Sequence, residues 1–192
     1  MRLVRLAVAG LLSAGMLAGC SGAQQANETL PSTTRTSASP SNTLPPLGPP
    51  DQKMPPEARE HNAAGAQAFV RYYLALMNRS QRLMGSEDIR LFSRDCATCM
   101  QFADGIDSYA QQGYRYDGGE ITLLSASSPA FVEDRVDFSL DLSQAALKVL
   151  DSAGSPVPGR GGTVAEYKSS GMSLAWDGRR STWVVRELTV SR

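Results

Sequence analysis

Hydrophobic and polar positions follow two different periods along this 192-residue chain, helical in its first half and strand-like in its second. Within residues 58–83, apolar side chains recur at the three- and four-residue spacing that places them on one face of a helix. These positions are Ala66, Phe69, Val70, Tyr73, Leu74 and Met77. Residues 86–95 predict a short second helix with Ile89 and Phe92 turned inward.

A third helix is predicted within residues 93–113. Asp95 is a suitable N-cap and Gly113 a suitable stop. The face expected to be buried contains Cys99, Phe102, Ala103, Ile106, Tyr109 and Ala110.

The period changes to strict alternation after residue 119. Strands are predicted over residues 120–125, 132–143 and 145–151, and 132–143 has the cleanest alternation in the chain. Residues 169–190 predict two long strands joined at Asp177-Gly178, a strong hairpin signal. The glycine-rich stretch 151–163 reads as a mobile connection. Helices followed by an antiparallel sheet predict the α+β class.

The first nineteen residues have the pattern of a secretory signal peptide, with a basic start and an apolar stretch too short to span a bilayer. The sequence Leu17-Ala18-Gly19-Cys20 that ends it resembles the lipobox of bacterial lipoproteins. That resemblance implies that Cys20 becomes the first mature residue and carries the lipid, with acyl chains such as palmitate. The expected location is the extracytoplasmic side of the cell membrane, held by the lipid anchor.

The predicted organisation has three parts. Residues 1–19 are the signal peptide, and 20–58 are the lipidated cysteine and a disordered tether rich in serine, threonine and proline. Residues 59–192 contain all thirteen aromatic side chains and form one globular α+β domain.

Charge excludes one class of partner. The chain has 19 basic and 19 acidic residues, and removal of the signal peptide with Arg2 and Arg5 leaves a formal net charge of −2. Without a basic field, binding to nucleic acid is not expected. The expected partners are the membrane, through the anchor, and an envelope protein, a wall component or a small ligand.

Cys96 and Cys99 are the two cysteines that remain after lipidation of Cys20. Residues three apart on a helix are about 5 Å apart, which a disulfide accepts. Zinc within one chain is not expected, because four ligands are needed and the single histidine, His61, lies on another predicted helix. A structural disulfide is favoured, while redox activity at a helix N-terminus remains an alternative.

The chain resembles an uncharacterised family of actinobacterial lipoproteins that carry a domain of unknown function. Residues 55–78, 91–113 and 116–123 carry the resemblance, together with the lipobox and the tether. Three helices followed by a long curved sheet also resemble the cone of the nuclear-transport-factor-like (cystatin-like) superfamily. The resemblance implies location and fold, and no activity.

The expected function is therefore non-catalytic binding of a ligand or a protein, without metal or cofactor. A cone would offer an apolar pocket, and its expected lining residues are Tyr73, Phe138, Trp176 and Trp183. One alternative is a small-molecule enzyme that uses a pocket Tyr/Asp pair from among Tyr72, Tyr73, Tyr114, Tyr116, Asp104 and Asp107. The other is a thiol–disulfide protein using Cys96 and Cys99.

Overall fold

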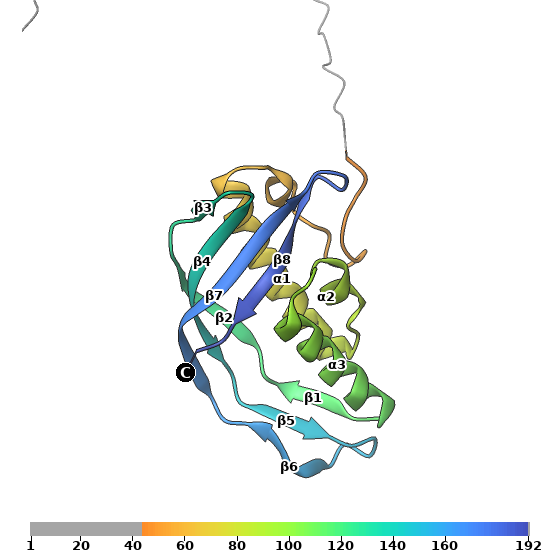
Figure 1. Ribbon diagram of the computed structural model, residues 1–192. Helices are drawn as coiled ribbons and strands as arrows, with labels where there is room; N and C mark the ends of the chain where they lie inside the picture. Colours follow the sequence, from red (N-terminus) through yellow and green to blue (C-terminus); the bar gives the residue numbers. More distant parts are fainter. Residues whose placement is uncertain (1–43, 192) are drawn as a thin grey trace, which may run out of the picture. The chain divides into compact units, whose positions relative to one another are not determined.

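Helices occupy the first part of the computed structural model and strands the second, and the structure describes residues 44–191 (Figure 1). The signal peptide and Cys20 lie outside the described residues. The helices are the 3₁₀-helix η1 (Pro56–Arg59), α1 (Ala63–Leu83), α2 (Glu87–Leu91) and α3 (Ala97–Gln111). The strands are β1 (Arg115–Gly118), β2 (Ile121–Ala126), β3 (Ala130–Val132), β4 (Arg135–Gln144), β5 (Leu147–Leu150), β6 (Pro156–Gly162), β7 (Ala165–Asp177) and β8 (Thr182–Thr189).

The strands form two antiparallel sheets. The larger sheet has the order β2-β4-β7-β8, with β3 also paired to β4, and the smaller has the order β1-β5-β6. The helices pack against one face of the larger sheet (Figure 1). The predicted α+β class is confirmed, and the sheets do not close into a barrel.

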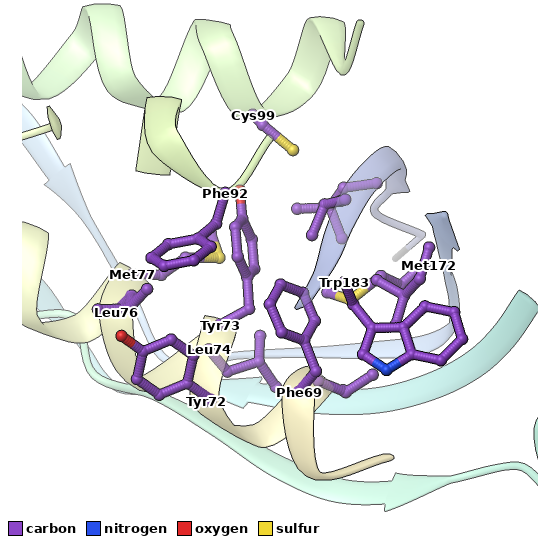
Figure 2. Packing of buried hydrophobic residues seen from close by; sticks show 14 of the residues in the cluster. Phe69, Tyr72, Tyr73, Leu74, Leu76, Met77, Phe92, Cys99, Met172 and Trp183 are labelled. Atoms are coloured by element: carbon purple, nitrogen blue, oxygen red, sulfur yellow. The ribbon is translucent and has the colours of Figure 1, made fainter. Parts of the chain in front are cut away.

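The core lies between α1 and the alternating strands. Four inward residues of β4, the positions Val136, Phe138, Leu140 and Leu142, are buried, whereas Ser139 between them is exposed. They share one cluster with Phe69, Tyr73 and Trp183, which are all fully buried (Figure 2). Period-2 alternation on β4 and helical periodicity on α1 thus supply the two halves of one core.

Several predicted elements differ in detail. The predicted strand 132–143 is interrupted at Glu133, whose φ of 56° allows a tight turn between β3 and β4. The stretch 151–163 was expected to be a connection but contains the edge strand β6. In β6, Gly161 lies so close to the Leu147 carbonyl of β5 that a side chain there would collide with it. The N-cap of α3 is Cys96 and not Asp95, which adopts a left-handed φ of 56°.

The ordered domain begins earlier than predicted, because residues 44–58 pack against it. Met54 and Ala58 are buried, and the Tyr72 hydroxyl donates to the Gln52 carbonyl at 3.2 Å. Gly48 passes so close to Tyr72 that no side chain would fit there. Proline-rich composition predicted disorder, but a few apolar anchors in the segment bury enough surface to order it.

Two polar side chains hold the margins of the domain. Arg59 donates three hydrogen bonds to main-chain carbonyls, those of Pro45, Arg180 and Ser181, and so joins the start of the described chain to the β7–β8 loop. At the edge of the larger sheet, the Asn78 amide both donates to and accepts from the main chain of Ile121, each at 2.8 Å.

Candidate functional site

An apolar cleft opens between α1, α3 and the inner face of the larger sheet. Its volume is about 170 Å³. Its lining side chains are Leu74, Met77, Thr98, Phe102, Ile121, Leu142, Gln144, Tyr167, Leu188 and Val190. The polar groups of the lining are few, and two of them pair with each other, since the Tyr167 hydroxyl donates to Gln144 Oε1 at 3.1 Å.

The size and chemistry of the cleft restrict what it accepts. Pockets for drug-sized ligands typically measure about 300–1,000 Å³, whereas a cavity of about 150 Å³ holds a benzene-sized group. Among the described residues that line the cleft, none carries a carboxylate, an imidazole or a thiol. The cleft therefore suits one apolar side chain or a short alkyl segment, held mainly by burial of apolar surface.

The four residues predicted to line a pocket do not line this cleft. Tyr73 and Trp183 are fully buried, lie outside the cleft lining and belong to the packed core. Phe138 contributes to a separate, more polar groove beside Arg71 and β2. The ring of Trp176 is covered by the ring of His61. Alternation identified the inward positions correctly, but the aromatic side chains expected around a pocket fill the core, and the opening lies elsewhere.

His61 is solvent-exposed, as predicted, yet it has an aromatic partner. Its ring stacks on Trp176 with centroids 4.6 Å apart and an angle of 8° between the planes. Trp183 meets both rings edge-on, at 5.2 Å from His61 and 5.1 Å from Trp176. Trp183 Nε1 also donates a hydrogen bond to the Glu60 carbonyl. The three rings and this hydrogen bond therefore join the residues just before α1 to the β7–β8 hairpin.

Cys96 and Cys99 form a disulfide, which confirms the prediction of a pair at the start of the third helix. Both residues are about 1% exposed. The Cys96 sulfur also accepts the Cys99 N–H at the helix N-terminus. A thiol–disulfide exchange partner needs access to the attacked sulfur, so this burial favours a structural role over redox exchange.

The acid–base candidates lie apart from the cleft. Burial raises the pKa of Tyr73 to about 12 and that of Tyr116 to about 12, and burial also raises the pKa of Tyr72. Asp104 and Asp107 form ion pairs with Arg90, and hydrogen bonds from Arg90 and then Ser86 lower the pKa of Asp107. The buried phenols and the paired carboxylates are therefore held in their resting protonation states at neutral pH.

Residues 44–191 contain neither a metal-binding group nor a membrane-spanning helix. No group of three or more histidine, cysteine or carboxylate side chains is placed to hold a metal ion there. No helix in the same range is long and apolar enough to cross a membrane.

Comparison with known proteins gives a distant structural likeness. No protein-family model matches the sequence, and no curated protein matches it. A solved structure of the intermembrane space region of chloroplast protein ARC6 is similar, with a TM-score of 0.45 and 21% sequence identity. The match covers 69% of this chain and 98% of that one. A likeness this remote says nothing about function.

Sequence reasoning missed the cleft as a site, although it placed several of its residues on inward faces. Phe102 and Leu142 were both expected to be buried, and the cleft lies where their packing is incomplete. Tyr167 precedes the part of β7 that had been predicted as a strand. A signal that was available in the sequence is the inward position of Gln144, a polar residue at the end of an otherwise apolar strand face.

Proposed function

We propose that this chain is a membrane-anchored extracytoplasmic lipoprotein whose domain binds a protein partner through the apolar cleft, without catalysis. Cys20 is the lipidated residue in this proposal. In this proposal, the helices and the larger sheet form a cone like that of the nuclear-transport-factor-like superfamily, with the cleft at its mouth. One anchoring side chain of the partner occupies the cleft.

The observation that carries the proposal is the cleft itself. Its volume of about 170 Å³ is small for a free metabolite but matches a single large side chain inserted from another protein. Anchors of this kind sit in desolvated pockets near the centre of protein interfaces. Val190 at the rim is exposed, which extends the apolar surface outward from the cleft.

The buried disulfide supports the location. Disulfides persist in oxidising compartments and are rare in the cytosol, and Cys96–Cys99 is the pair that remains once Cys20 carries lipid. The signal peptide pattern and the lipobox agree with it.

A photo-cross-linking residue at Val190 tests the binding face in intact cells. Val164 is the matched control, since it is also an exposed valine but lies outside the cleft lining. We expect a discrete protein adduct from position 190 that is absent from position 164. The adduct should weaken when Thr98→Phe fills the cleft. Identical patterns from both positions, or an adduct with the mass of a small molecule, would contradict binding of a protein through this face.

The anchor has a separate test. Cys20→Ala should release the protein from the membrane fraction and abolish incorporation of labelled palmitate. Retention in the membrane fraction with unchanged label would exclude Cys20 as the lipidation site.

A further inference from the structure

Arginines from three separate segments lie near the carboxylate of Asp177 at an end of the domain, and two of their side chains form ion pairs with it. Arg94 Nη2 lies 2.9 Å from Asp177 Oδ2, and Arg180 Nε lies 3.0 Å from the same oxygen. The main-chain N–H of Arg179 donates to the other carboxylate oxygen, at 3.1 Å. Arg59 joins the group by donating to the carbonyls of Arg180 and Ser181. We call Arg59, Arg94, Arg179 and Arg180 the arginine cluster.

The charge of the arginine cluster is only partly neutralised within the domain. Arg59 donates its hydrogen bonds to uncharged carbonyls, and Arg94 and Arg180 share the single carboxylate of Asp177. Of the nearby described acids, Asp95 pairs with Arg186, while Glu57 and Glu60 flank Arg59 in sequence. The four arginines therefore have only one carboxylate in direct contact, that of Asp177. Even when Glu57 and Glu60 are added, three carboxylates stand against four positive charges.

Exposed leucines border the arginine cluster. Leu91 is 46% exposed, and its carbonyl accepts a hydrogen bond from Arg180 Nη1 at 2.9 Å. Leu44 is 44% exposed and precedes Pro45, whose carbonyl accepts from Arg59. Guanidinium groups beside exposed aliphatic side chains suit the interface of an anionic bilayer, where the charges meet phosphates and the apolar groups enter the headgroup region.

The position of the arginine cluster matches the path of the chain. The described chain begins at Leu44 beside the β7–β8 loop (Figure 1). Twenty-three residues lie between Cys20 and Leu44, so the two positions are at most about 86 Å apart when this stretch is fully extended. If Cys20 carries the lipid, as the proposed function holds, the arginine cluster is on the part of the domain that is joined to the anchor.

We infer that the arginine cluster, with Leu44 and Leu91, is a docking surface for the anionic phospholipid headgroups of the membrane that holds the anchor. Docking seats this end of the domain on the bilayer. Because the tether confines the domain near the surface, a contact too weak to recruit a free protein suffices to orient a tethered one.

Vesicle co-sedimentation of the mature chain, residues 20–192 with Cys20→Ala, tests the inference without any contribution from lipidation. The vesicles are pure phosphatidylcholine or an equimolar mixture with phosphatidylglycerol. The chain should sediment with the mixture and much less with phosphatidylcholine, and added salt should weaken the binding. Because its formal net charge is −2, overall charge cannot produce that preference.

Arg179 provides the variant, because it is exposed and its contact with Asp177 is made by the main chain. Arg179→Gln should weaken binding to the mixed vesicles about fivefold, and Arg179→Glu about twentyfold. Arg82→Glu is the matched control, an equal change of charge on an exposed arginine at the far end of α1. Equal binding to both vesicle types, or equal losses from Arg179→Glu and Arg82→Glu, would overturn the inference. Failure of this assay leaves the palmitate-label result at Cys20 unaffected, so the two proposals fail separately.

Discussion

The segment before α1 is expected to be part of the cooperative domain, and Met54 tests this directly. Its side chain is 7% exposed and its sulfur accepts a hydrogen bond from the buried Thr182 hydroxyl, 128 residues away in sequence. Replacing a buried methionine by alanine removes apolar contacts and leaves a cavity, at a cost of about 2 to 5 kcal/mol. Met54 lies at the margin of the core, where neighbours can partly close the gap. We therefore expect Met54→Ala to cost about 2 to 3 kcal/mol.

For a domain of this size, that loss corresponds to a decrease in Tm of about 5 to 10 °C. Circular dichroism during thermal unfolding of residues 44–192 measures it. Lys53→Ala is the control, because Lys53 is exposed and surface substitutions usually change stability by less than about 0.5 kcal/mol. A Met54→Ala variant that melts with the Lys53→Ala control would refute the reasoning. So would a chain of residues 59–192 that is as stable as residues 44–192.

Three further outcomes concern the disulfide and two ionisable groups. Replacing Cys96 and Cys99 by alanine should cost about 2 kcal/mol, the chain entropy of closing so short a loop, and leave the fold intact by circular dichroism; loss of folding would contradict a merely local role. Burial opposes ionisation of Asp177, but hydrogen bonds from Arg180 outweigh it and lower the pKa, so its stabilising effect is present above pH 3.8 and lost as pH falls further. Asp177→Asn should therefore flatten the acid end of a stability–pH curve measured with denaturant, and an unchanged slope there would count against the ion pairs. Burial raises the pKa of Tyr73 from 10.0 to about 12, so the folded state retains the proton and stability declines across that interval. Tyr73→Phe should reduce that decline in alkaline denaturant titrations, and an equally steep decline would argue that Tyr73 is not buried in solution.

The order of helices and strands was predictable because each element carries its own hydrophobic period. The faces of α1, α3 and β4 followed from that period alone, and so did the β7–β8 hairpin from Asp177-Gly178. The division of the strands into two sheets could not be predicted from the hydrophobic period. Leu147–Leu150 reads as a strand in isolation, but its partners Arg115–Gly118 and Pro156–Gly162 have little side-chain pattern, and their pairing depends on tertiary contacts.

The candidate site was less predictable than the fold. Sequence periodicity distinguishes inward from outward positions, but it does not show where inward side chains fail to fill the space between layers. The aromatic residues expected around a pocket, such as Tyr73 and Trp183, fill the core, and the cleft lies beside Thr98 and Leu188. The arginine cluster was equally hard to predict, since it comes from three segments far apart in sequence and the chain has no excess of basic residues.

The side chain of Asn78 has a consequence for how the edge of the larger sheet meets other molecules. Its amide supplies Ile121 with the donor and acceptor that a neighbouring strand would otherwise provide. An open sheet edge is a template for pairing with another molecule. By occupying the donor and acceptor of Ile121, Asn78 blocks the pairing of a foreign strand at the start of β2. If Cys20 holds many copies on one membrane, as proposed, this contact limits edge-to-edge association between them.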